Sequence, residues 1–230
     1  MFQPAKDWNP LQTRLKEMMM KKEYFEEAKE LLLQMHSLLH TSEVYHTDKS
    51  TLMDEVWDGL EGESFRTMPT VKDDTAAWNI WHITRIEDLT TNLLIANNDQ
   101  VLSEEWLHRM NVTVRDTGNA MTDDEIIDLS GRIDREGLYQ YRNAVGRRTK
   151  DILQGLKQED MKRKVSQEGI ARIRLEGGVT EHVDSIWLLS FWGKKNIAGI
   201  LLMPVTRHQI VHLNDCRRLK SVIAKRLSRK

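Results

Sequence analysis

Three histidines in two distant segments carry the chemistry that is most readily recognised in this chain. His208 and His212 lie four residues apart near the C-terminus, and His82 lies in the segment Trp81-His82-Ile83. A spacing of four places two side chains one above the other on the same helix face. Two imidazoles from one helix and a third from another are enough to bind a divalent metal while leaving coordination positions open for chemistry.

Apolar periodicity places these histidines toward the core. In the helix predicted over residues 74–97, the apolar stripe consists of Trp78, His82, Ile86, Leu89 and Leu93. His208 and His212 lie on the corresponding stripe of the last predicted helix, which begins near Ile197. Burying several imidazoles is unfavourable unless their ring nitrogens are satisfied, and a bound metal satisfies them. One such histidine alone is more often a hydrogen-bonded core residue, but the three together predict a metal site at His82, His208 and His212.

A second histidine pair offers a rival ligand set. His36 and His40 are also four residues apart, so two such pairs can in principle supply four imidazoles. The stretch from His36 to His46 is equally typical of a helix end leading into a polar loop, which favours the first site. The remaining histidines, His46, His108 and His182, have polar neighbours and are predicted to lie on the surface.

Composition narrows the class of protein. The 230 residues are 40% hydrophobic and 30% charged, with only 4 Pro and 12 Gly, which favours helices. A formal net charge of −1 provides no overall basic field, so nucleic acid is not expected as a partner. The single cysteine excludes an intramolecular disulfide framework and fits a reducing compartment. No signal-like or membrane-spanning apolar segment is recognised, so we expect a soluble, cytoplasmic protein with no membrane partner.

The pattern along the chain predicts an all-α fold. Helices are predicted over residues 10–44, 51–60, 74–97, 104–110, 123–129 and 134–156, with two more beginning near Val183 and Ile197. Glycines within residues 161–180 favour a small hairpin or an irregular excursion there, and Pro204 is predicted to kink the last helix one turn before His208. We therefore expect one domain over residues 1–230, a four-helix bundle whose long connectors form a pocket at one end.

Residues near the predicted ligands suggest supporting roles. Ligating histidines usually donate their second N–H to an outer acceptor, and the candidates by sequence are Glu87, Asp88, Asn214 and Asp215. Arg85 and Arg207 adjoin the ligand turns, where ordinary salt bridges are expected more often than contacts to an anionic substrate. Cys216 is interpreted as a buried, inert thiol. Exposed aromatic residues in the connectors, Trp57 and Trp106, suggest an interface or a pocket lid.

Two blocks of sequence resemble a known family. The segment 78–88 (WNIWHITRIED) resembles the second-helix motif of the DinB superfamily, also called DinB/YfiT-like, and the segment 201–214 (LLMPVTRHQIVHLN) resembles its last-helix motif. This resemblance implies an up-down-down-up four-helix bundle that binds a divalent metal, nickel or zinc, through three histidines. By motif position those ligands are His82, His208 and His212. Characterised relatives include thiol-dependent S-transferases and isomerases. The long connectors and the segment 161–180 depart from the compact family pattern.

The leading hypothesis is a metal-dependent thiol S-transferase acting on a small-molecule substrate. The metal would hold a low-molecular-weight thiol as thiolate, and the sulfur would attack an electrophilic carbon. One alternative is a metal-dependent hydrolase that uses metal-bound water, and another is a non-enzymatic helical binding protein. The sequence assigns no catalytic or thiol-binding residue, does not choose between nickel, zinc, iron and manganese, and leaves open whether the chain forms a homodimer.

Overall fold

The computed structural model describes residues 3–228 and builds them from helices, with no β-strand among them, which confirms the all-α prediction. The first α-helices are α1 (Asn9–Met18), α2 (Phe25–Leu39), α3 (Ser42–Tyr45), α4 (Leu52–Trp57), α5 (Glu63–Arg66) and α6 (Ala76–Asp88). The later ones are α7 (Glu104–Arg109), α8 (Asp123–Arg132), α9 (Arg135–Gly155), α10 (Gln167–Leu175), α11 (Val183–Gly193), α12 (Ile197–Leu202) and α13 (His208–Leu227). Short 3-10 helices are η2 (Lys22–Tyr24) and η4 (Gln158–Lys162), and π-helical segments are η1 (Pro4–Trp8), η3 (Leu89–Ala96) and η5 (Met203–Arg207).

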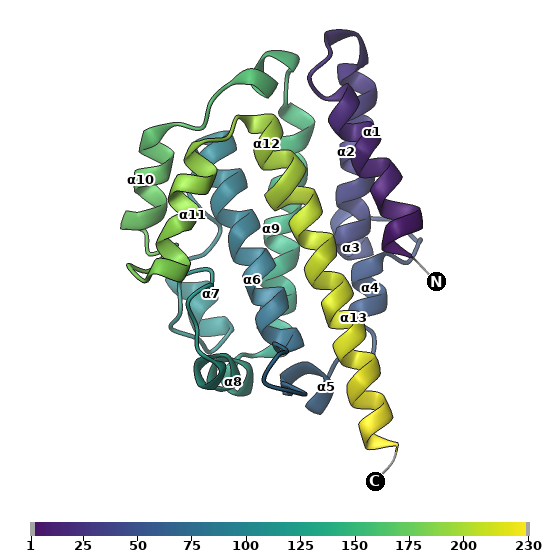
Figure 1. Cartoon of the computed structure of the whole chain (residues 1–230), viewed down its shortest axis with the longest axis vertical. Coiled ribbons are helices and arrows are strands. Elements are labelled where there is room, and N and C mark those ends of the chain that lie inside the picture. The colour runs from purple at the N-terminus through teal and green to yellow at the C-terminus, as the bar shows by residue number, and fades with distance from the viewer. Residues whose placement is uncertain (1–2, 229–230) are drawn as a thin grey trace.

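Helix α6 lies at the centre of the fold. It contacts α13 on one side and α9 on another, and α9 in turn contacts α2 (Figure 1). All 13 residues of α6 are buried, so its polar side chains must find partners inside the protein. Arg85 illustrates this requirement, because its guanidinium donates to Asp88 and to the hydroxyl of Tyr141. The polar groups of α6 are therefore held in fixed positions.

The first predicted helix is wrong in extent. Residues 10–44 do not form one helix, because the chain reverses between α1 and α2 and the two helices pack against each other. Lys21 adopts an extended backbone (φ −98°, ψ 123°) at the reversal. Arg14 and Glu27 consequently form an ion pair, although 13 residues along a single helix would separate them by roughly 20 Å. No Gly or Pro marks this turn in residues 18–24.

The predicted hairpin is also wrong. Within residues 161–180 the chain forms α10, and the only pairing of strand type among the described residues is an isolated bridge between Lys164 and Asn196. Ser166 caps α10 by accepting a hydrogen bond from the Gly169 amide, and Gly177 ends it with a positive φ of 75°. Gly169 thus lies in the first turn of α10, and Gly177 lies just after its end. Neither forms the hairpin turn that the sequence suggested.

The last predicted helix is interrupted where Pro204 was expected to kink it. Regular α-helix ends at Leu202, the π-helical segment η5 follows, and α13 starts at His208. Proline lacks the amide hydrogen that an α-helical bond requires at this position. The Gln12 amide donates to the Leu202 carbonyl and to the Thr206 hydroxyl, which satisfies groups in the irregular turn. The wider turn sets the rotation of α13, and with it the direction of the histidines that follow.

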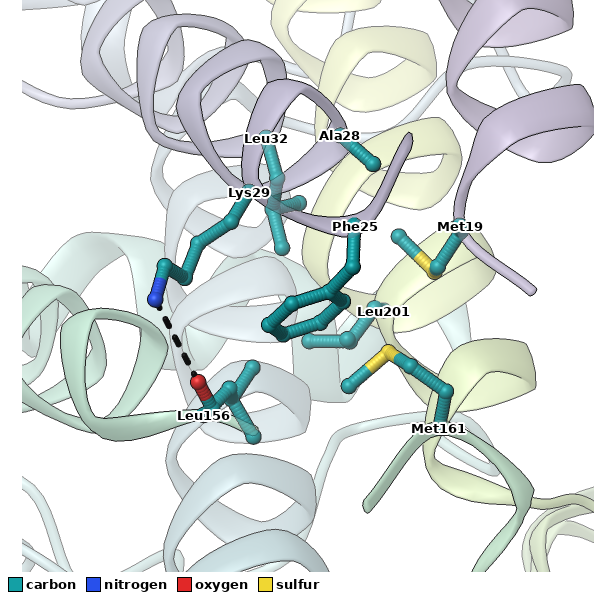
Figure 2. A pocket seen from close by; sticks show the side chains of 8 residues that line it. All are labelled: Met19, Phe25, Ala28, Lys29, Leu32, Leu156, Met161 and Leu201. Atoms are coloured by element: carbon teal, nitrogen blue, oxygen red, sulfur yellow. Dashed lines mark hydrogen bonds between the residues drawn. The ribbon is translucent and has the colours of Figure 1, made fainter. Parts of the chain in front are cut away.

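The run of three methionines near the first reversal, residues 18–20, contributes two side chains to the core. Met18 and Met19 are buried, whereas Met20 is 37% exposed. Met19 lines a very small apolar cavity of about 10 Å³ between α2 and α12, where Phe25, Met161 and Leu201 meet it (Figure 2). Flexible thioethers fill such irregular gaps well. This cavity is a feature of core packing, because none of its lining residues is a histidine, cysteine or acid.

Trp57 and Trp106 were predicted to be exposed, and this prediction is wrong. Trp57 is only 8% exposed and belongs to the apolar core, and Trp106 is partly buried against it. Arg135 stacks over the Trp57 ring at 4.5 Å from its centroid, which covers its remaining face. These residues therefore anchor the connectors to the core. Across residues 3–228, no helix combines the length and apolar composition that crossing a membrane requires.

Candidate metal centre

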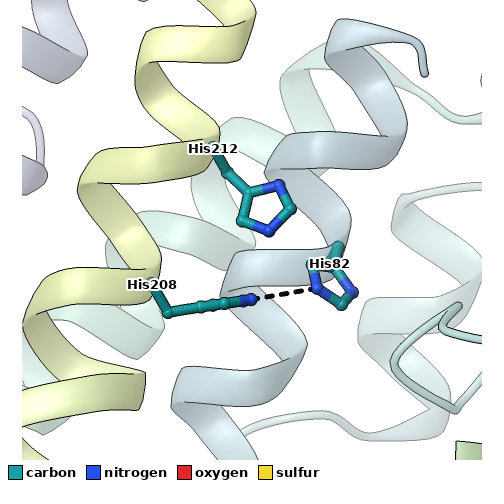
Figure 3. Close-up of side chains that lie close together, drawn as sticks. All are labelled: His82, His208 and His212. Atoms are coloured by element: carbon teal, nitrogen blue, oxygen red, sulfur yellow. Dashed lines mark hydrogen bonds between the residues drawn. The ribbon is translucent and has the colours of Figure 1, made fainter. Parts of the chain in front are cut away.

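The three predicted ligand histidines meet between α6 and α13. His82 comes from α6, and His208 and His212 come from successive turns of α13 (Figure 3). Their ring centroids form a nearly equilateral triangle, with separations of 4.9 Å (His82–His208), 4.8 Å (His82–His212) and 4.5 Å (His208–His212). One nitrogen from each ring lies within 4.8 Å of the other two. Contact between the central helix and α13 thus brings residues 126 positions apart to one point.

The tautomer of His82 is set by a connector carbonyl. The Nδ1–H of His82 donates to the carbonyl oxygen of Thr117 at 2.7 Å, so its Nε2 carries the lone pair. Trp78 stacks on the same imidazole, with centroids 4.6 Å apart and planes inclined by 10°. The indole of Trp78 in turn donates to the Gly118 carbonyl. A methyl group at Gly118 would lie 2.7 Å from that indole nitrogen, so this connector fits closely over the site.

His212 is oriented through an amide on the central helix. Its Nδ1–H donates to Asn79 Oδ1 at 2.6 Å, which leaves the lone pair on Nε2. The Asn79 amide nitrogen donates to the Thr75 carbonyl at 2.8 Å, and this bond determines which end of the amide faces His212. Thr75 itself caps α6 by accepting from the Trp78 amide. The helix cap and the histidine orientation are therefore parts of one hydrogen-bonded unit.

The spacing of the ring nitrogens fits a bound cation. Nε2 of His208 lies 3.1 Å from Nε2 of His82. Two nitrogen ligands, each about 2.0–2.1 Å from an ion, lie roughly 2.9–3.4 Å apart at coordination angles between 90° and tetrahedral. His208 Nδ1 is buried without a hydrogen-bond partner among the described residues, so the protein fixes this ring less firmly than the other two. The donor set and its outer hydrogen bonds match a divalent metal site.

Burial keeps all three rings neutral. It lowers the pKa of His82 to about 4, although the hydrogen bond to Thr117 acts in the opposite direction. Burial and the charge of His82 lower the pKa of His212 to about 3. Burial, His82 and His212 lower the pKa of His208 well below its ordinary value. Neutral imidazole is the form that binds a metal, so no proton has to leave at neutral pH.

An apolar cavity of about 220 Å³ adjoins the histidines. It is lined by Ile86, Asn119, Trp187, Leu188, Phe191, Trp192, Met203, Pro204 and His208. His208 therefore faces both the other histidines and the cavity. No acidic residue, lysine or arginine lines it, and Asn119 contributes the one uncharged amide. A small apolar molecule in this cavity would lie beside the metal position.

The origin of the cavity differs in part from the sequence prediction. Long connectors were expected to shape a pocket, yet Asn119 alone comes from a connector and most lining residues belong to α11 and η5. Trp187 lines the cavity and is 47% exposed. The apolar run in residues 186–192 was the signal that could have located this wall. Nothing in the sequence marked Thr117 or Asn119.

The predicted outer partners of the ligands are wrong. Asp88 accepts hydrogen bonds from Arg85, from Tyr141 and from the backbone of the following connector. The Asn214 amide donates to the Ile210 carbonyl, and Asp215 pairs with Arg218. The acceptors that the ligands use are the Thr117 carbonyl and the Asn79 amide. Both depend on tertiary contacts that helical periodicity does not reveal.

Arg85, Arg207 and Cys216 have the structural roles that were favoured for them. Arg85 forms a buried ion pair with Asp88, and Arg207 is exposed and donates to Asn9. Cys216 is fully buried, and burial raises the pKa of its thiol to about 12. A protonated, inaccessible thiol is a poor nucleophile. The predicted surface histidines His46, His108 and His182 are exposed.

The second histidine pair lies at a helix end, as the sequence suggested, because α2 ends at Leu39, but both side chains are buried in the core. His36 and His40 are both 0% exposed, and each donates its Nε2–H to the carboxylate of Glu87 at 3.0 Å. The phenol of Tyr45 lies 2.7 Å from His36 Nδ1. The pair does not join the first three histidines in one site. Glu87, predicted as an outer partner of those ligands, belongs to this second cluster instead.

The carboxylate of Glu87 and the neighbouring histidines affect one another's pKa values. Burial alone would raise the pKa of the Glu87 carboxyl, but His40 and His36 outweigh it and hold that pKa well below its usual range. Burial lowers the pKa of His40 to about 3, so His40 is a neutral hydrogen-bond donor to an ionised carboxylate. The Arg142 guanidinium is buried nearby and donates to Thr84, Leu39 and Gln209.

Comparison with protein-family models and with curated protein sequences finds no match for this chain. The resemblance to the DinB superfamily therefore rests on the two sequence blocks around the histidines and remains a prediction. The arrangement of His82, His208 and His212, by contrast, is a property of the fold described above.

Proposed function

We propose that this protein is a divalent-metal-dependent enzyme of the DinB superfamily type, and that it transfers low-molecular-weight thiols to electrophilic small molecules. The proposal includes the up-down-down-up four-helix bundle of that superfamily, with nickel or zinc bound by His82, His208 and His212. The observation that carries it is the convergence of three neutral imidazoles at the wall of an apolar cavity, with His208 common to both.

The lining of the cavity favours a thiol as the nucleophile. A divalent cation held by three neutral imidazoles supplies Lewis acidity, which favours the ionised form of a thiol at neutral pH. The protein offers no nucleophile of its own there, because Cys216 is fully buried and absent from the lining. The side chains of Trp187, Phe191 and Met203 would hold an apolar electrophile against His208. The Asn119 amide can orient one polar group of it.

Hydrolysis receives less support from the same residues. A hydrolytic site of this kind commonly places a carboxylate where it can accept a proton from the attacking water. The group formed by His82, His208 and His212 contains no carboxylate, and none lines the cavity. A thiol ionises far more readily than water, so a metal-bound thiol needs no such carboxylate and fits these surroundings better.

The first test is metal content combined with thiol binding. Protein refolded with Co²⁺ would be titrated with glutathione and with cysteine, because sulfur coordination to Co²⁺ produces an intense near-ultraviolet absorption. We expect this band in the wild type and its loss in a His82→Ala, His208→Ala, His212→Ala triple variant. The matched control is His108→Ala, which removes an exposed histidine and should behave like wild type.

Turnover would then be measured with zinc- and nickel-loaded protein, as loss of free thiol in the presence of alkyl halides, epoxides and activated alkenes. Acceleration that requires the three histidines and a thiol is the expected result. Turnover of esters or amides with all thiols removed would instead favour the hydrolase. Metal bound by the three histidines without any thiol absorption band would contradict the transferase and leave the metal site intact.

A further inference from the structure

We propose that His36, His40 and Glu87 form a second, closed divalent-metal site that joins α2 to α6. Two imidazoles and one carboxylate converge here from two different helices, with one ligand-type atom of each within 4.8 Å of the others. All three side chains are 0% exposed. This inference concerns a different set of residues from the proposed enzyme site and does not depend on the reaction assigned there.

The distances in the second cluster suit coordination. His36 Nε2 lies 3.0 Å from Glu87 Oε1, and His40 Nε2 lies 3.0 Å from both carboxylate oxygens. These values fall within the roughly 2.9–3.4 Å expected between donors about 2.0–2.2 Å from one ion. With both oxygens of Glu87 turned toward the imidazoles, the cluster supplies four donor atoms. The two carboxylate oxygens lie too close together to occupy two corners of a tetrahedron, so zinc would be held by three residues and would take a water as its fourth ligand.

The second cluster repeats the construction of the first. In each, two histidines four residues apart come from one segment, and α6 provides the third ligand. His208 and His212 both lie in α13, whereas His36 lies in α2 and His40 is the residue that follows its last turn. His82 and Glu87 are five residues apart on α6, so they point to widely separated directions around the helix axis. One direction meets α13 and the other meets α2. The central helix therefore carries one ligand for each of two metal positions.

Neighbouring groups hold the second cluster in this arrangement. In the metal-bound form His36 would donate its Nδ1–H to the Tyr45 hydroxyl, which lies 2.7 Å away, as His82 donates to Thr117. Gly146 of α9 packs against the other ring, where an added methyl group would lie 2.4 Å from His40 Nδ1. Gly146 therefore closes one side of the His40 ring, and Tyr45 contacts the His36 ring.

The surroundings indicate a structural ion. The residues that line the cavity beside the first site include none of this cluster, and neither does the small cavity in the core. The ligand set of two imidazoles and one carboxylate suits zinc and also ferrous or manganous ions. A sealed site of this kind would stabilise packing between α2 and α6 and would exchange its ion slowly.

The test begins with a variant that leaves the second cluster untouched. A His208→Ala, His212→Ala protein would be unfolded in guanidinium with a chelator, refolded with Zn²⁺ and analysed for zinc after gel filtration. Only the second cluster then offers a group of three ligands among the described residues. We expect about one equivalent of zinc and a higher melting temperature than in the same variant refolded without zinc. Absence of retained zinc would overturn the proposal and leave a hydrogen-bonded network only.

A second variant tests whether the second cluster itself binds the retained zinc. Glu87→Gln keeps the size of the side chain but removes the negative charge and one oxygen donor. Added to the His208→Ala, His212→Ala background, it should abolish the remaining zinc. Full zinc retention in a folded protein of this kind would contradict the assignment. If Glu87→Gln prevents folding, zinc retention by the His208→Ala, His212→Ala protein alone decides the question.

Discussion

The two histidine clusters are built alike but differ in their access to solvent and ligands. His208 and His212 are partly exposed, and His208 borders an apolar cavity large enough for a small molecule. His36, His40 and Glu87 are completely enclosed. The first set is three neutral imidazoles, whereas the second includes an ionised carboxylate. Ligand spacing alone therefore does not separate an accessible from an enclosed cluster, because both clusters share it. The two clusters differ in their access to solvent and in the charge of their side chains.

The strongest way to test this contrast is to remove one member of each cluster. Glu87→Ala should lower the free energy of unfolding of the metal-free protein by about 3 kcal/mol or more, because two buried donors lose their shared acceptor. His208→Ala should cost only about 1 kcal/mol, because it removes one hydrogen bond between neutral rings, that to His82, and its Nδ1 already lacks a partner. Denaturant titration measures both values. Equal losses would contradict the distinction between a sealed and an accessible cluster.

Acid should destabilise the metal-free protein through its neutral buried histidines. Their pKa values of about 4 (His82) and about 3 (His212) lie below the ordinary 6.5. As pH falls below 6.5 the unfolded chain gains protons that the folded chain does not, so stability is complete above that pH and lost below it. Each histidine contributes a slope of about 1.4 kcal/mol per pH unit down to its folded pKa.

Unfolding titrations between pH 4.5 and 7.5 would measure this slope. A His82→Ala, His212→Ala variant should show a slope smaller by about 2.8 kcal/mol per pH unit. His108→Ala is the matched control, and it should leave the slope nearly unchanged because His108 is exposed. A wild-type slope that persists in the double variant would show that other groups cause the acid sensitivity.

Orientation of the accessible cluster can be tested through Asn79. Asn79→Ala removes the acceptor for His212, so the affinity for Zn²⁺ should fall by about 10- to 100-fold. Competition with a chromophoric chelator measures the affinity. Asn214→Ala is the control, because Asn214 lies near the ligands in sequence but donates to the Ile210 carbonyl of its own helix. Similar affinities for both variants would remove Asn79 from the site.

The smallest effects concern glycines on α9. Gly146→Ala should destabilise the protein by about 1–2 kcal/mol, because its methyl group would overlap His40. Gly155→Ala on the same helix meets no atom within 4 Å and should stabilise it by about 0.5–1 kcal/mol. Thermal unfolding would measure the two shifts. A neutral Gly146→Ala would mean that the sealed cluster has room to relax.

Sequence periodicity predicted the parts of this structure that depend on a single helix. The all-α class and the inward direction of His82, His208 and His212 follow from apolar spacing. The reversal before α2 was missed because residues 18–24 contain no helix-breaking residue, and α10 was missed because its glycines resembled strand turns. The sequence predicted that His36 and His40 lie close to each other, but it did not predict their contact with Glu87. That contact spans 47 to 51 residues and depends on packing between α2 and α6.

The accessible site shows the same limit. Nothing local marks Thr117 as the acceptor for His82 or Asn79 as the acceptor for His212, since both arise from tertiary contacts. The cavity wall was only partly foreseen, because the exposure of Trp187 depends on where the α11 helix lies rather than on its own composition. Ligands on one helix are therefore predictable, and their outer partners are not.

The most direct test of the metal centre is a crystal structure of the zinc-loaded protein with data collected on both sides of the zinc absorption edge. We predict an anomalous peak about 2.0–2.1 Å from a ring nitrogen of each of His82, His208 and His212. A zinc-loaded crystal without a peak between these three rings, with the rings joined only by hydrogen bonds, would contradict it.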